Sequence, residues 1–163
     1  MLRAVGAVGD AESKYYTFVA VFEDGSRRLV AVIGTDEGPR VDFDAFAVLQ
    51  SHPWDDILAG KVASARVRVA IKESRYQVGK YQDPDHWVSY RMVTEFDEGV
   101  LYGMVERGSD IAKKLAESSR YGQAYPMLDI EIDPVDIQSK QVLIKRIHSE
   151  DWIEDVVAPA EEQ

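Results

Sequence analysis

The sequence contains no cysteine and no asparagine. The absence of cysteine excludes disulfide bridges, zinc sites with thiolate ligands, iron–sulfur clusters and cysteine nucleophiles. Biased codon usage is the simplest explanation for the missing asparagine, and selection against heat-labile residues is the alternative. Every function class that depends on a thiol is therefore excluded.

The sequence also lacks long apolar runs and catalytic motifs. No run approaches the length that spans a bilayer, and the first residues lack the apolar block of a signal peptide. Neither a glycine-rich phosphate loop nor a Gly-x-Ser-x-Gly elbow occurs, and the histidines at 52, 86 and 148 share no ligand spacing. We therefore expect a cytoplasmic or virion-associated protein that is not secreted, contacts no membrane, and has neither catalytic residues nor a cofactor.

The residues that are present are typical of a globular domain. Apolar residues make up 45% of the 163 residues and charged residues 29%, which is enough for one core with a charged surface. No linker or internal repeat is visible. We predict a single domain over residues 1–163, in which residues 149–163 form a short acidic helix and tail.

The stretch 61–72 is predicted to contain the central strand. Apolar residues occupy every second position and basic residues stand between them, so one face is expected in the core and the other face outside. Arg66 and Arg68 lie on the outer face in this interpretation. The apolar positions are Ala65, Val67, Val69 and Ile71.

Hairpin signals such as Asp24-Gly25 recur along the chain, and strands do not alternate regularly with helices. This order predicts an α+β fold with a mostly antiparallel sheet of about six to seven strands and two to three helices packed on one face. Besides the central strand, strands are predicted at 15–22, 27–33, 87–96, 100–106, 127–132 and 142–147, with a weak edge strand in 1–10. Helices are predicted from 42 or 44 to 49, over 53–58, from 110 towards Gly122 and after Ser149, and loops at 34–40 and 77–87.

The net charge of −10 is distributed unevenly. Basic residues predominate between 61 and 80, whereas only acids occur at 129–136 and after Arg146. Because an acidic protein repels nucleic acid at long range, a nucleic-acid binder would have to use the basic stretch. The basic residues are Lys61, Arg66, Arg68, Lys72, Arg75 and Lys80, and the acids are Asp129, Glu131, Asp133 and Asp136, then Glu150, Asp151, Glu154, Asp155, Glu161 and Glu162.

The acids Asp129, Glu131 and Asp133 share one face of a predicted strand. An Asp-x-Glu pair on a strand resembles the first motif of the DEDD-type 3′–5′ exonucleases, in which such carboxylates hold the metal ions that activate water. This resemblance covers residues 128–133 and implies a metal-dependent nuclease or phosphotransfer enzyme as an alternative. We favour a different interpretation, in which the acids are solvated or pair with Arg66 and Arg68 on a neighbouring strand.

The run 75–81 combines tyrosines with basic residues, namely Arg75, Tyr76, Lys80 and Tyr81. Aromatic rings and cations together can stack bases and neutralise phosphates, but tyrosine and arginine also dominate protein–protein interfaces. Because the chain as a whole is acidic, we favour a protein partner over direct nucleic-acid binding.

We therefore predict a non-enzymatic protein-binding domain, either a small acidic subunit of a larger assembly or an inhibitor that docks on a basic partner surface. Separated charges would orient such a complex and speed its association. Phage accessory proteins, virion components and immunity proteins are analogies, and a nucleic-acid mimic that faces a DNA-binding protein is a further alternative. The predicted partner-binding residues are Arg66, Arg68, Arg75, Tyr76, Lys80, Tyr81, Glu150, Asp151, Trp152, Glu154 and Asp155.

Overall fold

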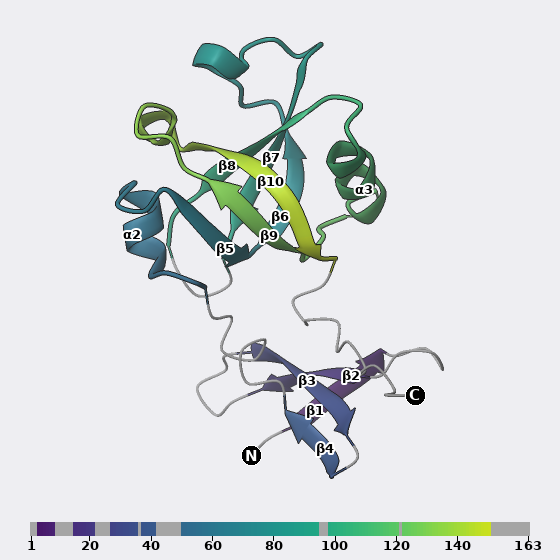
Figure 1. Ribbon diagram of the computed structural model, residues 1–163. Helices are drawn as coiled ribbons and strands as arrows, with labels where there is room; N and C mark the ends of the chain where they lie inside the picture. Colours follow the sequence, from purple (N-terminus) through teal and green to yellow (C-terminus); the bar gives the residue numbers. More distant parts are fainter. Residues whose placement is uncertain are drawn as a thin grey trace, which may run out of the picture. The chain divides into compact units, whose positions relative to one another are not determined.

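The computed structural model describes residues 3–8, 15–21, 27–35, 37–41, 50–94, 98–120 and 122–150 (Figure 1). The chain divides into two compact units. The described part of the first unit lies within residues 3–41, and that of the second within residues 50–150. Each unit is described by itself.

The first unit contains a four-stranded antiparallel sheet in the order β1-β2-β3-β4. Its strands are β1 (Arg3–Val8), β2 (Tyr15–Val21), β3 (Arg27–Thr35) and β4 (Gly38–Val41). The strands predicted at 15–22 and 27–33 and the edge strand in 1–10 are confirmed. The loop predicted at 34–40 is wrong in part, because Gly38 adopts a φ of 112° that suits a tight turn, and the chain returns beside β3 as β4.

The second unit contains a six-stranded sheet in the order β5-β9-β10-β8-β7-β6. Its strands are β5 (Ser64–Arg68), β6 (Ala70–Ser74), β7 (Trp87–Val93), β8 (Leu101–Glu106), β9 (Met127–Glu131) and β10 (Gln141–Ser149). All neighbouring strands are antiparallel except β8 and β10, which run parallel.

The two outermost strands of this sheet, β5 and β6, are the two halves of the predicted central strand, separated at Val69. The first half pairs with β9 and the second with β7. Ile71 pairs with a neighbour on each edge of β6. It lies opposite Met92 on β7, and on the other edge it exchanges backbone hydrogen bonds of 2.8 and 3.2 Å with Ala124. The sheet therefore closes on itself as a barrel (Figure 1).

The connections give the barrel a Greek-key path. The β5–β6 segment, β7 and β8 follow one another as neighbours, β9 returns to the far side of β5, and β10 fills the space between β9 and β8. The helix α3 (Asp110–Ser118) connects β8 to β9, and the short helix α2 (Trp54–Leu58) precedes β5. Two single turns of 3₁₀ helix, η1 (Gly79–Tyr81) and η2 (Asp136–Ser139), lie in the loops before β7 and β10.

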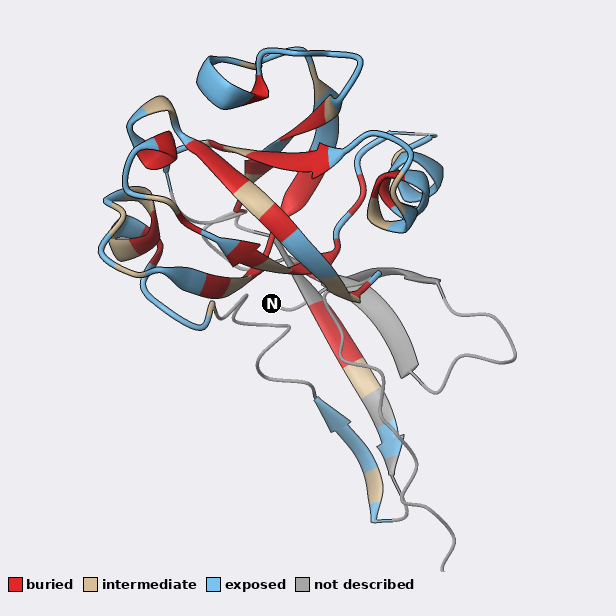
Figure 2. Cartoon of the chain, turned by 45° about the horizontal axis from the view of Figure 1, so that its top comes forward, coloured by how far each residue is buried: buried red, intermediate tan, exposed pale blue. Residues whose placement is uncertain are grey.

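The core of the second unit fills the barrel, and each strand of the barrel carries buried residues (Figure 2). Ile57 from α2 and Leu115 from α3 join the same core. Gly103 on β8 is required by this packing, since a Cβ atom there would lie 2.5 Å from Ile144 Cδ1 and 2.8 Å from the Met92 sulfur. The fully buried side chains include Val67, Ile71, Met92, Leu101, Met104 and Leu128.

The α+β class is confirmed, but the helix content is lower than predicted. Among the described residues only α3 exceeds two turns; Ser109 caps it by accepting a 3.1 Å hydrogen bond from the Ala112 N–H. The helix predicted over 53–58 is the single turn α2, with Asp55 and Asp56 in its first turn as expected. The ten strands form two sheets instead of one, and α2 and α3 lie on opposite sides of the barrel (Figures 1 and 2).

Three other features of the sequence prediction lie outside the described residues: the Asp24-Gly25 turn, the helix ending at 49 and the acidic segment from 151 onwards. In the part of the chain that is described, no helix has the length and apolar character needed to cross a membrane.

Candidate functional site

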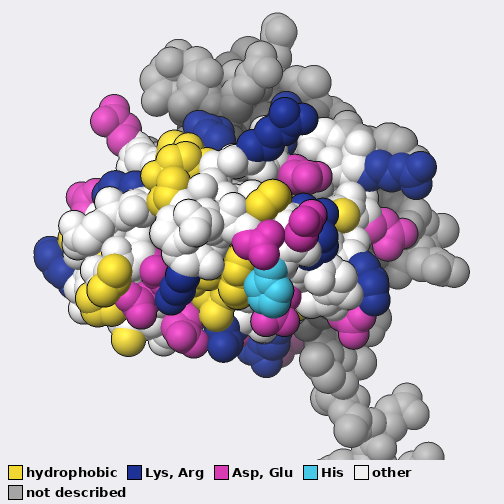
Figure 3. Space-filling view, turned by 90° about the horizontal axis from the view of Figure 1, so that it is seen from above, with side chains coloured by type: hydrophobic (Ala, Val, Ile, Leu, Met, Phe, Trp, Pro, Cys, Tyr) yellow, Lys and Arg dark blue, Asp and Glu magenta, His cyan; other side chains and the backbone are white. Residues whose placement is uncertain are grey.

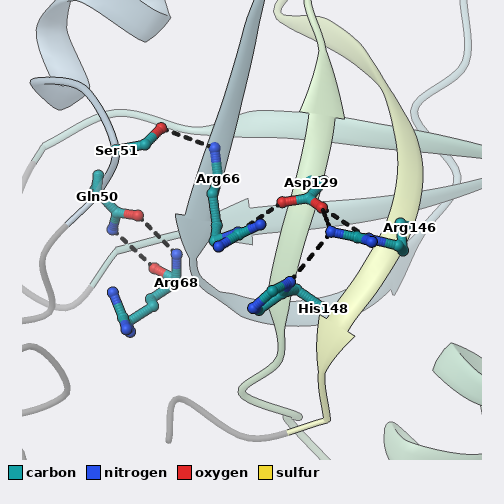
Figure 4. A network of polar contacts seen from close by, with 7 residues as sticks. All are labelled: Gln50, Ser51, Arg66, Arg68, Asp129, Arg146 and His148. Atoms are coloured by element: carbon teal, nitrogen blue, oxygen red, sulfur yellow. Dashed lines mark hydrogen bonds and ion pairs between the residues drawn. The ribbon is translucent and has the colours of Figure 1, made fainter. Parts of the chain in front are cut away.

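The predicted acidic row on β9 lies beside basic side chains of both neighbouring strands. Arg66 Nε on β5 donates to Asp129 Oδ1 at 2.8 Å, and Arg146 Nε on β10 donates to Asp129 Oδ2 at 2.9 Å (Figure 4). Glu131 pairs with Lys145 at 3.3 Å. The predicted pairing is thus confirmed for Asp129 with Arg66 only, and charges of opposite sign meet within the unit.

The two arginines also determine the charge state of Asp129. Partial burial disfavours its ionised form, but the hydrogen bonds from Arg66 and Arg146 outweigh this effect and hold the pKa of Asp129 below its ordinary value. Each carboxylate oxygen is already bound by a guanidinium group. Across the described ranges, no three acidic or histidine side chains come together as metal ligands, so the nuclease alternative gains no support from this row.

Arg68 is buried, with 7% of its surface exposed, so the prediction that it faces outward is wrong. The reason is that both faces of residues 67–71 are buried; residues 50 and 51 lie along β5 and bind its backbone (Figure 4). The Gln50 amide accepts from the Arg68 N–H at 2.6 Å and donates to the Arg68 carbonyl at 2.9 Å. Ser51 and Arg66 make an equivalent pair of hydrogen bonds at 2.8 and 3.0 Å.

Lys80 and Tyr81, which were predicted to bind a partner, instead connect the η1 loop to the η2 turn. The Tyr81 hydroxyl donates to Asp136 Oδ2 at 3.1 Å, and Lys80 Nζ lies 2.6 Å from the same oxygen. Burial, together with the Asp136 carboxylate, raises the pKa of Tyr81 to about 12, and the hydrogen bond to Asp136 raises the pKa of Lys80. Both side chains thus join the η1 loop to the η2 turn.

The outer surface of β6, β7 and β8 carries a different group of side chains. Lys72 on β6 lies directly opposite Arg91 on β7, and Arg91 lies opposite Tyr102 on β8. Tyr76 stacks on Tyr102 with ring centroids 4.2 Å apart. We call Lys72, Arg75, Tyr76, Arg91 and Tyr102 the basic tyrosine face.

The cations of the basic tyrosine face differ from Arg66, Lys80, Lys145 and Arg146, which pair with acids. Lys72, Arg75 and Arg91 are exposed and form no ion pair with any described carboxylate. On the face of the molecule seen in Figure 3, acidic and basic side chains are intermixed. This face therefore holds three cations without an acidic partner among the described residues, whereas Arg107 and Lys140, which also lack one, bind backbone carbonyls.

A cavity of about 440 Å³ opens beside this face, where the chain leaves β6 and enters β7. Arg75, Ser89 and Arg107 line it. The Ser89 hydroxyl is buried and has no hydrogen-bond partner. Arg107 Nε donates to the Pro84 carbonyl at 2.7 Å, which holds its guanidinium group at the cavity wall. A second hollow of about 390 Å³ lies beside His52, Arg66 and Asp129.

Glu150, another predicted partner-binding residue, is not brought to this face. Glu150 is exposed and lies 3.9 Å from Lys114 of α3. Asp151, Trp152, Glu154 and Asp155 lie outside the described residues. Sequence reasoning missed Ser89, Arg91, Tyr102 and Arg107, because only the register across β6, β7 and β8 places them beside residues 72–76.

Comparison with known proteins gives no match to a protein-family model, to a curated protein or to a solved structure.

Proposed function

We propose that the chain is a non-enzymatic binding domain that holds single-stranded nucleic acid on the basic tyrosine face. One observation carries the proposal: Lys72 and Arg91 lie directly opposite each other, without carboxylate partners among the described residues, next to the stacked rings of Tyr76 and Tyr102. This combination provides positive charge and an aromatic surface on one patch.

The unpaired cations are explained by an anionic ligand. Like charges directly opposite each other on neighbouring strands destabilise a sheet, and elsewhere in the unit such cations lie beside acids, as Arg66 and Arg146 do beside Asp129. A phosphate chain running across β6 and β7 would relieve the repulsion between Lys72 and Arg91. It would also gain free energy from the release of its condensed counterions.

The tyrosines make a single strand a better ligand than a duplex. Tyr76 is 39% exposed and lies on Tyr102, whose ring supports it from β8. Stacking of an unpaired base on an aromatic ring contributes about 1–3 kcal/mol and requires no particular base. In a duplex the base faces are covered, so only the phosphates could contact this surface.

The barrel itself supports the same proposal by analogy. A closed five-stranded Greek-key barrel is the architecture of the OB fold, in which the outer surface of the second and third strands, with the adjoining loops, binds oligonucleotides or oligosaccharides. When β5 and β6 are counted as one bent strand, β7 and β8 hold these two positions. This likeness of architecture raises the expectation but identifies no ligand.

The overall acidity of the chain is compatible with this function. Most of the net charge of −10 comes from residues outside 50–152. Screening at physiological salt limits repulsion between exposed charges to about 8 Å, so a local patch can bind although the whole chain is negative. We expect binding to weaken steeply as salt is raised.

A protein partner, which the sequence alone favours, is the competing proposal. Exposed Tyr76 beside Arg75 and Arg91 would also suit an acidic protein segment, since tyrosine and arginine dominate interface energies. The nucleic-acid-mimic proposal has less support, because Asp129 and Glu131 pair with basic residues instead of standing free.

Fluorescence anisotropy with labelled poly-dT, poly-rU and a matched duplex tests the proposal. We expect single strands to bind more tightly than the duplex, and the double variant Lys72→Gln/Arg91→Gln to weaken binding and reduce the slope of log affinity against log salt by about 1.4. Tyr76→Ala should weaken binding about tenfold, and Tyr76→Phe should restore it.

Lys113→Gln is the matched control, because it removes an exposed charge from α3 on another part of the unit. The proposal is overturned if no single strand binds at low salt, or if the control weakens binding as much as the double variant. Capture of an acidic protein by the wild type, lost in the double variant, together with no nucleic-acid binding, would favour the protein partner.

A further inference from the structure

We infer that the cavity lined by Arg75, Ser89 and Arg107 is a nucleotide site that binds one phosphate group with its attached sugar and base. The inference rests on the proposed function in one respect: the nucleotide is taken to be a unit of the bound strand. The cavity is continuous with the basic tyrosine face through Arg75, which belongs to both.

The Ser89 hydroxyl indicates that a polar ligand belongs in the cavity. Ser89 lies on β7, is 1% exposed, and its oxygen has no hydrogen-bond partner. A buried hydroxyl without a partner destabilises the free protein, so buried polar groups are nearly always satisfied. Rotation of the Ser89 side chain toward the cavity would bring this hydroxyl to a phosphate oxygen, which would accept its hydrogen bond.

Two arginines supply the charge that a phosphate requires. Arg75 has no carboxylate partner among the residues described, and its guanidinium group is free to form a bidentate contact. Arg107 is already oriented by hydrogen bonds to the carbonyls of Pro84 at 2.7 Å and Trp87 at 3.4 Å. Its other N–H groups form no hydrogen bond with a described residue.

The rest of the lining suits a nucleotide better than a bare anion. Glu73 and Gln82 also line the cavity. A carboxylate repels a phosphate but accepts hydrogen bonds from a sugar hydroxyl or a base amino group. The volume of about 440 Å³ exceeds the need of an inorganic phosphate and lies within the range of small-ligand pockets, about 300–1,000 Å³.

Backbone amide chemical shifts of the full chain, recorded by NMR, test the inference with three probes: adenosine 5′-monophosphate, adenosine and inorganic phosphate. We expect the monophosphate to shift the amides of Arg75, Ser89 and Arg107. Adenosine should shift them at least tenfold less at the same concentration, and inorganic phosphate should bind more weakly than the monophosphate.

Ser89→Ala is the decisive variant, because it removes one hydrogen bond to the phosphate while leaving the folded protein no less stable. We expect a loss of about fivefold in monophosphate affinity with an unchanged or higher melting temperature. Arg75→Gln should weaken binding of the monophosphate more than of adenosine, and Lys113→Gln should change neither.

The outcomes for the cavity and for the basic tyrosine face are separable. If the monophosphate shifts none of these amides while poly-dT still binds, the nucleotide site is wrong and the proposed function stands. If the monophosphate binds with the expected dependence on Ser89 while no oligonucleotide binds, the cavity takes free nucleotides and the proposed function is wrong. Equal shifts from adenosine and the monophosphate would also overturn the phosphate site.

Discussion

Gln141 on β10 binds the backbone of Val78 with both ends of its side-chain amide. Its Oε1 accepts from the Val78 N–H at 3.0 Å, and its Nε2 donates to the Val78 carbonyl at 3.1 Å. The two residues are far apart in sequence, and Gln141 is 2% exposed. This pair attaches the 75–86 loop to the outside of the barrel.

The first prediction follows from this contact. Replacing Gln141 with alanine leaves the Val78 backbone without its partner and removes a buried amide, so we expect Gln141→Ala to lower the free energy of unfolding by about 1–3 kcal/mol. Amide hydrogen exchange over residues 77–81 should accelerate more than exchange in β9. Gln138→Ala, at a neighbouring exposed site, is the control, and an equal effect of both variants would contradict the role of Gln141.

The second prediction concerns acid stability. The pKa of Asp129 is lower in the folded protein than in the unfolded chain, because the hydrogen bonds from Arg66 and Arg146 outweigh partial burial. Its contribution is therefore present above the unfolded pKa of about 3.9 and is lost as the pH falls through the folded value. Asp129→Asn should cost about 1–2 kcal/mol at neutral pH.

Urea unfolding of the wild type and Asp129→Asn over a series of pH values measures this difference. The two stability curves should converge as the pH falls through the lowered pKa of Asp129 in the folded protein. A difference that stays constant down to the lowest pH would show that the variant acts through packing instead of charge.

The third prediction concerns alkaline stability. Burial, assisted by Asp136 for Tyr81 and by Glu73 for Tyr90, raises the pKa of both tyrosines to about 12. Since the folded values exceed the unfolded value of about 10, the stabilisation is complete below pH about 10 and is lost as the pH rises through about 12.

Ultraviolet titration of tyrosinate should show late ionisation of Tyr81 and Tyr90. Tyr81→Phe and Tyr90→Phe should each remove one late transition and make stability less dependent on pH above 10. If both variants keep the full set of late transitions, other tyrosines are responsible.

The fourth prediction tests the packing inside the barrel. Gly103→Ala places a methyl group 2.5 Å from Ile144 Cδ1, and overpacking of this kind costs about 1–3 kcal/mol. Ile144→Val removes that methyl group of the isoleucine, so in the double variant the cost should be smaller than the sum of the two single costs. Additive costs would mean that backbone movement, not this contact, absorbs the strain.

Local patterns in the sequence predicted much of the local structure. The alternation of apolar residues from Ala65 to Ile71 located the β5–β6 segment, and Ser109 marked the start of α3. Among the acids of β9, Asp129 pairs with Arg66 as expected, whereas Glu131 pairs with Lys145. In each case the structure depends on residues that are close in sequence, or on side chains that face each other on adjacent strands.

Barrel closure and the basic tyrosine face could not be predicted in this way. Ile71 pairs on both sides only because the strand bends at Val69, and both faces of residues 67–71 are then buried. The prediction that Arg68 faces outward is wrong for this reason. Arg91 and Tyr102 reach Lys72 through a register that spans three strands, and no local pattern specifies that register.

The double pairing of Ile71 has a consequence for how the second unit meets other molecules. An open sheet ends in a row of unused N–H and C=O groups on which a further chain can polymerise, the usual starting point of fibrils. In the described strands of the barrel, those terminal rows are joined to each other through Ile71 and Ala124. We therefore expect this unit to resist amyloid-type growth and to recognise its ligands through side chains.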